Sequence, residues 1–222
     1  MTRFDTSLLP PAPDLQFEQK LWENGLSEIA GIDEAGRGAL AGPVAAGVAV
    51  FRPDDSLQVS LKGLRDSKQM TPAERNAWTG YIQESAFAWG VAFASHEEID
   101  RLGIVPATRL AAQRALQACK CQADHLLLDY LFLPDITIPQ TKLVKGDQRS
   151  LSVAAASVLA KTKRDELMVE LDCKFPGFHL AENKGYGTRQ HLAAIERIGP
   201  SEIHRKSFAP IRTSLLDKQL CP

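Results

Sequence analysis

Apolar residues along the chain fall into short continuous runs that alternate with longer amphipathic stretches. Short apolar runs bounded by turn residues predict strands, and longer stretches with a repeat near 3.6 residues predict helices. The predicted strands cover residues 29–34, 43–51, 86–94, 125–129 and 142–144. The predicted helices cover residues 15–26, 72–85, 107–119, 150–173 and 189–197.

The order of these elements predicts an α/β fold. The first three strands are separated by short loops or by one helix, so antiparallel pairing is open to them. The later strands alternate with helices, which calls for parallel additions to the same sheet. We therefore expect a mixed β-sheet with helices on both faces. Three parts of one domain are expected: a loose arm and short helix at 1–28, a core at 29–173, and a C-terminal loop and helical portion at 174–222.

Composition narrows the functions that this fold can serve. The formal net charge is −1, so bulk electrostatics give no reason to expect nucleic-acid binding, and any phosphate contact must come from local basic clusters. No apolar run reaches the length of a membrane span, and the N-terminus lacks the apolar segment of a signal peptide. The four cysteines show no zinc-ligand spacing and suit free thiols in a reducing compartment. A cytoplasmic protein without a membrane partner is expected.

Acidic residues stand at the ends of the predicted apolar segments. Asp33 and Glu34 close the first strand, Asp129 closes the fourth, and Asp147 follows the fifth. If the first and fourth strands are parallel neighbours, their carboxylates converge. Carboxylate oxygens are ligands that Mg²⁺ and Mn²⁺ prefer. Two such ions side by side would stabilise the attacking and leaving oxygens of a phosphodiester displacement.

Each acid also has an ordinary structural explanation. An Asp-Glu pair before a glycine turn is usually solvated, and an Asp that closes a strand commonly caps the next element. Adjacent strand residues point to opposite faces, so Asp33 and Glu34 share one site only if the strand ends or bulges there. Gly36 and Gly38 permit such a change of backbone. The joint placement of the acids favours a metal site but leaves the caps open.

Two glycine-containing segments are candidates for substrate binding. The turn Gly36-Arg37-Gly38 can offer backbone groups and a guanidinium to sugar hydroxyls or phosphate. It can equally be a tight turn with a solvated arginine. Tyr186, between two glycines, can stack on a sugar or base, or else anchor its loop.

Basic residues form clusters that are usually solvated faces, and those near the acids are the best candidates for phosphate contacts. The clusters are Lys142, Lys145 and Arg149; Lys161, Lys163 and Arg164; and Arg205, Lys206 and Arg212. Lys145 is singled out because it stands two residues before Asp147. Ser67 and Lys68 can grip a phosphate or begin a helix. The histidines lack metal-ligand spacing, and His191 and His204 are expected to be structural or solvated.

The string GIDEAGRGALAGPV at residues 31–44 resembles the opening motif of bacterial ribonuclease HII, a type-2 RNase H. Further motifs of that family follow in the family's order: Asp66-Ser67-Lys68, the apolar strand ending in Asp129, Lys145-Gly146-Asp147, SVAAASVLAKTKRD, Gly185-Tyr186-Gly187-Thr188 with His191, and HRKSFAP. The resemblance covers residues 29–212, and the ordered set is highly specific.

This resemblance implies an RNase H-like fold with a C-terminal helical extension. It implies an endoribonuclease acting on RNA–DNA hybrids and on the 5′ side of single ribonucleotides in duplex DNA, with 3′-OH and 5′-phosphate products. It implies that Asp33, Glu34, Asp129 and Asp147 hold two Mg²⁺ or Mn²⁺ ions. It also implies that the Gly36-Arg37-Gly38 backbone senses a ribose 2′-OH and that Tyr186 packs against the next sugar.

Some features depart from the family or leave alternatives open. Tyr130 follows Asp129 where the family often has glycine, which can alter the backbone and narrow the cleft. The 28 residues before Ile29 are too few for the N-terminal domain of ribonuclease HIII. The tail shows no obvious motif for a protein partner, and the length suits a working monomer. A different RNase H-like nuclease, which needs no 2′-OH sensor, and a non-enzymatic nucleic-acid-binding module both stay open.

Overall fold

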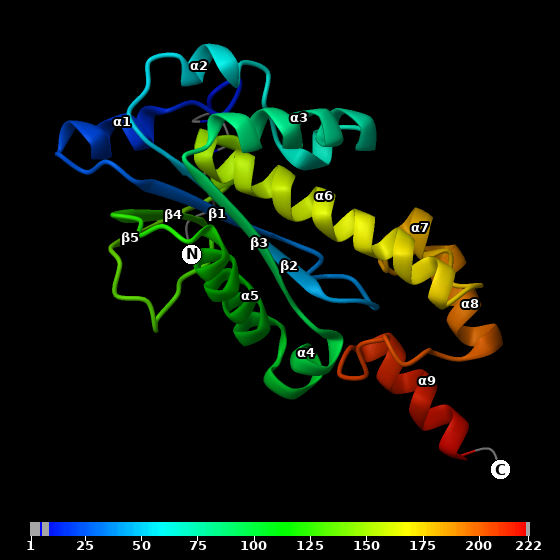
Figure 1. Ribbon diagram of the computed structural model, residues 1–222. Coiled ribbons are helices and arrows are strands. Elements are labelled where there is room, and N and C mark those ends of the chain that lie inside the picture. Colours follow the sequence, from blue (N-terminus) through cyan, green and yellow to red (C-terminus); the bar gives the residue numbers. More distant parts are fainter. Residues whose placement is uncertain (1–4, 6–8, 221–222) are drawn as a thin grey trace.

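A five-stranded mixed sheet forms the centre of the computed structural model, which describes residue 5 and residues 9–220 (Figure 1). Its strands are β1 Ile29–Ala35, β2 Val44–Phe51, β3 Ala88–Ala94, β4 His125–Asp129 and β5 Gln140–Leu143, in the spatial order β3-β2-β1-β4-β5. β2 pairs antiparallel with β1 and β3, whereas β1, β4 and β5 run parallel. The carboxyl ends of these three parallel strands therefore meet at one edge of the sheet.

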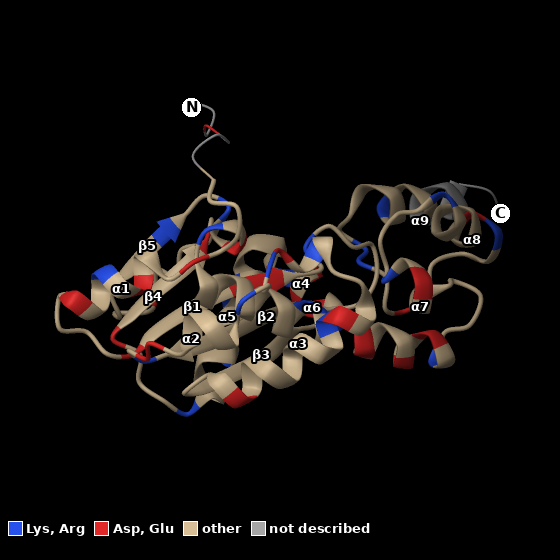
Figure 2. Cartoon of the chain, turned by 90° about the horizontal axis from the view of Figure 1, so that it is seen from above, with Lys and Arg blue, Asp and Glu red and all other residues tan. Residues whose placement is uncertain are grey.

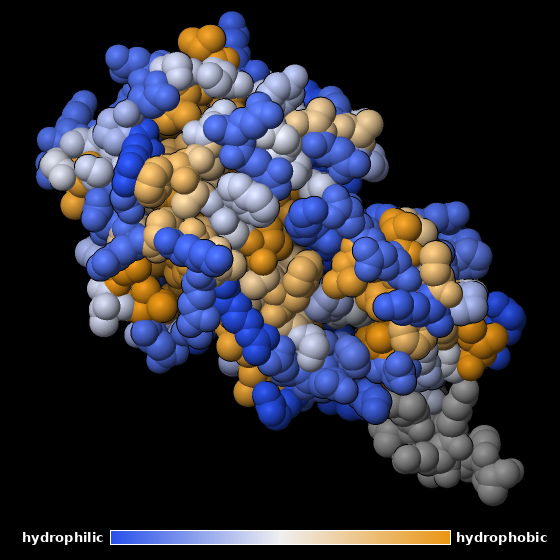
Figure 3. Space-filling view, viewed as in Figure 1, coloured by the Kyte–Doolittle hydropathy of each residue, from blue (hydrophilic) through white to orange (hydrophobic). Residues whose placement is uncertain are grey.

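Helices cover both faces of the sheet (Figure 1). α6, Leu151–Lys174, packs against β1 and β2 on one face, and α5, Ile104–Cys119, packs against β2 and β3 on the other. The other helices are α1 Gln16–Glu23, α2 Leu57–Ser60, α3 Pro72–Ser85, α4 His96–Leu102, α7 Leu180–Asn183, α8 Arg189–Ile198 and α9 Ala209–Leu220, with 3₁₀ turns η2 Ser67–Gln69 and η3 Gly146–Gln148. α7, α8 and α9 form a C-terminal portion beyond the sheet, at the end of α6 (Figure 1), and Figure 3 shows the surface of the molecule in the same view.

The strands β1 and β2 are buried on both faces because their side chains alternate between two cores. Ala30 and Ile32 of β1 join the core beneath α5, whereas Ile29 packs on the α6 side with Val153. Two glycines let the α6 backbone come very close. A Cβ on Gly31 would lie 2.1 Å from the backbone of Ser152, and one on Gly47 would lie 2.2 Å from the Ala156 carbonyl oxygen. The small residues of the sheet therefore fix how closely α6 lies over β1 and β2.

The N-terminal segment is tied to the core where the structure describes it. Asp14 forms an isolated parallel bridge with Ser150, and Leu15 is buried, so these two residues are not part of a loose arm. Glu18 of α1 is fully buried, and its Oε1 accepts hydrogen bonds from the hydroxyls of Ser150 and Ser152. This contact holds α1 against the start of α6. Most of the expected arm, residues 1–4 and 6–8, lies outside the described residues.

The predicted strands and helices are all present, with ends shifted by a few residues. The structure adds α4, α9 and the short helices α2 and α7, which apolar periodicity did not predict. Ser95 and Glu98 form a reciprocal capping box at the start of α4, and this Ser-x-x-Glu signature is visible in the sequence. The α/β prediction of a mixed sheet between layers of helices is confirmed.

The charges, the helix lengths and the cysteines of the described part of the chain bear on what the composition predicts. Lys and Arg are interspersed with Asp and Glu along the chain (Figure 2). No helix among the described residues has the length and apolar character needed to cross a bilayer. Cys119, Cys121 and Cys173 carry free thiols, whereas Cys221 and the last residue of the tail fall outside the described part.

The close approach of α6 predicts a sharp difference between two glycines. Gly47→Ala would force the new Cβ into the α6 backbone, and we expect it to lower the free energy of unfolding by about 3 kcal/mol. Gly80→Ala is the matched control, because Gly80 is exposed in α3 and a Cβ added there would meet nothing within 4 Å. It should raise stability by about 0.5–1 kcal/mol through helix propensity. Urea unfolding followed by circular dichroism measures both, and equal effects would contradict the packing argument.

Candidate active site

Three aspartates from distant parts of the chain converge at the carboxyl edge of the sheet. Asp33 lies in β1, Asp129 ends β4, and Asp147 lies in η3, which follows β5. Each offers a carboxylate oxygen, and these oxygens all lie within 4.8 Å of one another. The parallel pairing of β1 with β4 and of β4 with β5 brings them together. The convergence that the sequence made conditional on parallel neighbours is therefore present.

Burial and like charge oppose ionisation of these acids. Burial, followed by the charges of Glu34 and Asp129, raises the pKa of Asp33 well above its ordinary value. Burial is also the main cause that raises the pKa of Asp129 to about 6, with Asp147 adding to it and the hydrogen bond from the Gly146 amide opposing it. Carboxylates crowded in this way would attract a cation, and the bound cation would offset the repulsion between them.

Glu34 adjoins the three aspartates without joining their cluster. The register of β1 with β2 continues through Ala35, so the bulge considered from the sequence is absent; the strand instead ends one residue after Glu34, and both acids line the hollow described below. Glu34 Oε1 accepts a hydrogen bond of 3.0 Å from Arg37. Its Oε2 is buried and has no hydrogen-bond partner among the described residues. A buried carboxylate oxygen without a partner is costly, and a hard cation is a ligand that would satisfy it.

Lys68 and Ser67 support the aspartates in different ways. Lys68 Nζ lies 3.0 Å from Asp147 Oδ2 on a side chain that is 73% exposed. Burial lowers the pKa of Lys68, but the Asp147 carboxylate outweighs this effect, so the pKa lies above its ordinary value. Ser67 is buried and hydrogen-bonds at 2.9 Å to Ser157 of α6, which in turn hydrogen-bonds to Asp33. The helix-cap interpretation of this segment also holds, because the Asp66 side chain caps η2.

A hollow of about 200 Å³ joins the acids to the Gly-Arg-Gly turn and to Tyr186. It is lined by Asp33, Glu34, Ala35, Gly36, Arg37, Gly38, Ser67, Lys68, Asp129, Ser157, Lys161 and Tyr186. The ring of Tyr186 is partly exposed and would lie 4.0 Å from a Cβ on Gly38. The turn and the tyrosine loop, 148 residues apart along the chain, thus line one small space side by side.

Two fully buried arginines hold these two segments together. Arg205 donates hydrogen bonds of 2.8 Å to the carbonyls of Gly36 and Arg37. Arg164 of α6 donates 2.9 Å hydrogen bonds to the carbonyls of Pro43 and Lys184. The sequence placed both arginines in clusters expected to be solvated or to bind phosphate. The structure corrects this expectation. The N–H groups of both arginines donate to backbone carbonyls that have no partner in a helix or strand.

Other residues lie at the margin of the hollow or were missed. Lys145 adopts a left-handed backbone at the start of η3, and Tyr130 does so after Asp129 with φ of +52°. Neither lines the hollow, and Tyr130 is 57% exposed with Lys142 Nζ 5.3 Å from its ring. Ser157, which was not a candidate, and Lys161, which was named only within a basic cluster, both line it. Their spacing of four places them on one face of α6, but nothing in the sequence shows that this face meets the acids.

Comparisons with known proteins cover most of the chain. The sequence model of the family described as Ribonuclease HII matches residues 30–211. A ribonuclease HII of Dehalococcoides mccartyi is 48% identical over 201 residues, which is 88% of this chain and 92% of that protein.

Solved structures share the fold. The ribonuclease H2 from Pyrococcus horikoshii OT3 superposes with a TM-score of 0.71 at 24% identity, over 86% of this chain and 99% of that one. Bst-RNase HIII in complex with Mn²⁺ superposes with a TM-score of 0.66 at 18% identity, over 87% of this chain and 71% of that one. An acid cluster on an RNase H fold, in a chain that matches the family almost throughout, leads to one conclusion. This protein belongs to the ribonuclease HII family, which makes it a metal-dependent hydrolase with RNase H activity on RNA–DNA hybrids.

Proposed function

We propose that the protein also cuts duplex DNA on the 5′ side of a single embedded ribonucleotide, by two-metal-ion hydrolysis that leaves 3′-OH and 5′-phosphate ends. The observation that carries this proposal is the hollow in which converged aspartates face a Gly-Arg-Gly turn and Tyr186. A ribose 2′-OH is what distinguishes RNA from DNA at a given position. A sensor of that group beside the cutting site would allow a lone ribonucleotide to be recognised.

Asp33, Glu34, Asp129 and Asp147 are the residues that would hold Mg²⁺ or Mn²⁺. Their oxygens form an all-carboxylate set suited to either ion. The unpartnered Glu34 Oε2 supports this assignment. When bound, the ions would stabilise charge on the attacking and leaving oxygens of the phosphodiester. The Mn²⁺ in the related Bst-RNase HIII supports a divalent ion and leaves the choice between the two open.

The residues around the acids would bind and orient the substrate. Arg205 holds the Gly36 and Arg37 carbonyls, so the turn presents a fixed backbone to the sugar. The exposed ammonium of Lys68 lies at the mouth of the site and suits a phosphate contact. Ser67 would act indirectly, by holding Ser157 against Asp33.

Further roles follow from exposure and position. Tyr186 would pack its accessible ring against the sugar after the ribonucleotide, which favours an RNA-to-DNA junction. Lys145 would contact a phosphate beyond the hollow, on the β5 side. A cytoplasmic location and a monomeric state, both expected from the sequence, stay predictions.

The metal-site assignment predicts that Asp129→Asn raises the melting temperature without metal but reduces the stabilisation that metal gives. Asp129→Asn removes one negative charge from the cluster, yet its amide oxygen can still accept the Gly146 hydrogen bond. Because the pKa of Asp129 is raised, its ionised form is disfavoured in the fold at neutral pH. We therefore expect the variant to melt a few degrees higher in EDTA, by about 2–4 °C. It should lose most of the further rise that MnCl₂ gives the natural protein.

Asp135→Asn is the matched control, because Asp135 is exposed and its carboxylate contacts Gln113 of α5 and is not one of the clustered acids. It should melt like the natural protein with and without manganese. An Asp129→Asn variant that kept the full manganese-induced rise would contradict the ligand assignment.

The proposed activity is tested with a labelled DNA duplex that contains one ribonucleotide. With Mg²⁺ or Mn²⁺, we expect a single cut on its 5′ side, no cut in EDTA, and no cut in an all-DNA duplex of the same sequence. Asp129→Asn should lower kcat/KM by at least about a thousandfold, equivalent to ~4 kcal/mol of transition-state stabilisation. Cleavage of the all-DNA duplex, or full activity of the variant, would count against the proposal.

Junction sensing predicts a selective defect at Tyr186. Tyr186→Ala should lower kcat/KM about tenfold or more on the single-ribonucleotide duplex, in the range of a lost stacking contact. Its effect on a long RNA–DNA hybrid should be several times smaller, because a long hybrid offers no nearby junction. Tyr186→Phe keeps the ring and should stay near the natural ratio between the two substrates. Equal losses on both substrates would exclude junction sensing by this residue.

A further inference from the structure

A line of buried hydrogen bonds connects the C-terminal portion to the loop that carries Tyr186. His191 of α8 and His204 of the following loop are both fully buried, with their Nε2 atoms 3.1 Å apart. His191 Nδ1 lies 2.9 Å from the carbonyl oxygen of Tyr186. His204 Nδ1 lies 3.0 Å from the backbone nitrogen of Ser201 and 2.9 Å from its hydroxyl. All four ring nitrogens of the pair therefore have polar contacts.

Only one arrangement of protons satisfies these contacts. The carbonyl of Tyr186 can only accept, so Nδ1 of His191 carries a proton. The amide of Ser201 can only donate, so Nδ1 of His204 is bare and its proton lies on Nε2. The Nε2–H of His204 then donates to the bare Nε2 of His191. A second proton on either ring would set two N–H groups against each other.

Burial keeps both rings neutral. Burial and then the neighbouring His191 lower the pKa of His204 to about 4, and burial lowers the pKa of His191. His96 of α4 and His179 before α7 add further opposition to a positive charge. The ring of Phe178 packs against His204 at a centroid distance of 4.7 Å. The single proton arrangement is therefore kept at neutral pH.

The loop that carries His204 also holds the Gly-Arg-Gly turn. Arg205 directly follows His204, and its guanidinium holds the Gly36 and Arg37 carbonyls. Its backbone amide donates to the carbonyl of Leu40 at 2.8 Å. Two consecutive residues thus contact two separate segments. His204 is linked to Tyr186 through His191, and Arg205 bonds directly to the turn.

We propose that His191 and His204 are positioning residues that set Tyr186 against the Gly-Arg-Gly turn and so determine how strongly a ribonucleotide junction is preferred. The proposal rests on the proposed roles of Tyr186 and the turn. A buried polar pair is costly unless each member is satisfied, and here each bond is directional. An apolar pair would fill the same space but leave the Tyr186 carbonyl with the Thr188 amide alone among the donors described, and so without the bond that ties its loop to the histidine pair.

Kinetics on two substrates test the proposal. His204→Leu removes the donor to His191, and we expect the ratio of kcat/KM on a single-ribonucleotide duplex to that on a long hybrid to fall about tenfold, as for one lost hydrogen bond. His204→Gln can still place an amide N–H near His191, and it should keep the ratio within about threefold of the natural value. This rescue would not follow from a merely structural role.

Ile195→Ala controls for lost stability in the same portion. Ile195 is buried in the apolar cluster around α8, and its side chain has no polar atom that could form a hydrogen bond to the Tyr186 loop. Its variant should lose stability and leave the ratio unchanged. A natural ratio in His204→Leu, or equal losses on both substrates in every variant, would overturn the proposal. If the natural protein cut the hybrid but not the single-ribonucleotide duplex, the proposed function would fail instead.

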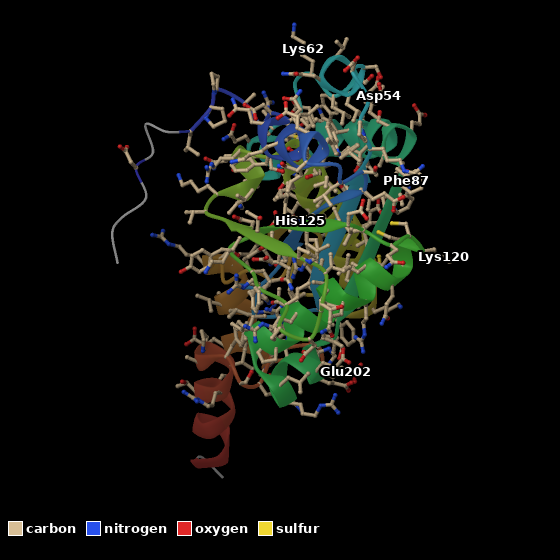
Figure 4. The ribbon with its side chains drawn as sticks, turned by 90° about the vertical axis from the view of Figure 1, so that its left-hand side faces the viewer. Asp54, Lys62, Phe87, Lys120, His125 and Glu202 are labelled. Carbon is tan, nitrogen blue, oxygen red and sulfur yellow. The ribbon has the colours of Figure 1, made fainter. Side chains whose placement is uncertain are left out.

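Nitrogen-15 NMR of histidine-labelled natural protein tests the pair without any variant. His191 should show a protonated Nδ1 and His204 a protonated Nε2, both rings neutral at pH 7. His125 of β4 (Figure 4), whose Nε2 contacts the Thr141 hydroxyl at 2.8 Å, serves as an assigned reference outside the pair. Any other tautomer of His191 or His204, or a charged ring, would overturn the proposed relay even if His204→Leu failed to fold.

Discussion

The approach of α6 to β1 and β2 determines where most of the active-site groups lie. Gly47 pairs in register with Asp33, and a side chain at that position would collide with the backbone of α6 at Ala156. The next residue, Ser157, therefore reaches Asp33. Further along the same helix, Arg164 reaches the carbonyl of Pro43. A shift of α6 away from the sheet would move the support of the aspartate together with the support of the segment that follows the turn.

The acid cluster shows why such rigid support is needed. Burial and mutual repulsion raise the pKa of Asp33 and of Asp129, so without a cation the cluster opposes folding at neutral pH. Lys68 offsets part of this cost through Asp147, but its exposed side chain remains free to exchange partners. Packed backbone holds the carboxylates together despite their repulsion. The protein therefore has little further rearrangement to make when cations bind.

The sequence predicted those parts of the site that depend on chain direction and periodicity. Parallel neighbours must bring Asp33 and Asp129 to one sheet edge, and this is why the acids could be found before any coordinates. The sequence could not reveal that Arg164 and Arg205 are buried, because a basic residue beside other basic residues looks the same whether it meets phosphate or backbone carbonyls. Ser157 escaped notice for a related reason, since a serine inside a run of small helix residues carries no sign of the aspartate opposite.

The turn and the tyrosine loop differ from the acids in how they are held. The aspartates lie on strands and on η3, whose positions follow from the sheet. Gly36, Arg37 and Tyr186 lie on loops, which have no ladder to satisfy their carbonyls. Buried arginine and histidine donors serve these carbonyls together with turn amides, since Ala39 donates to Gly36 and Thr188 donates to Tyr186. Since each donor serves a carbonyl from a different segment, the distance between turn and tyrosine is set by side chains of the C-terminal portion. The acids and the sensing loops thus share α6 as a support, but only the loops also need the donors of the C-terminal portion, so selectivity for a ribonucleotide can change while the acid cluster stays in place.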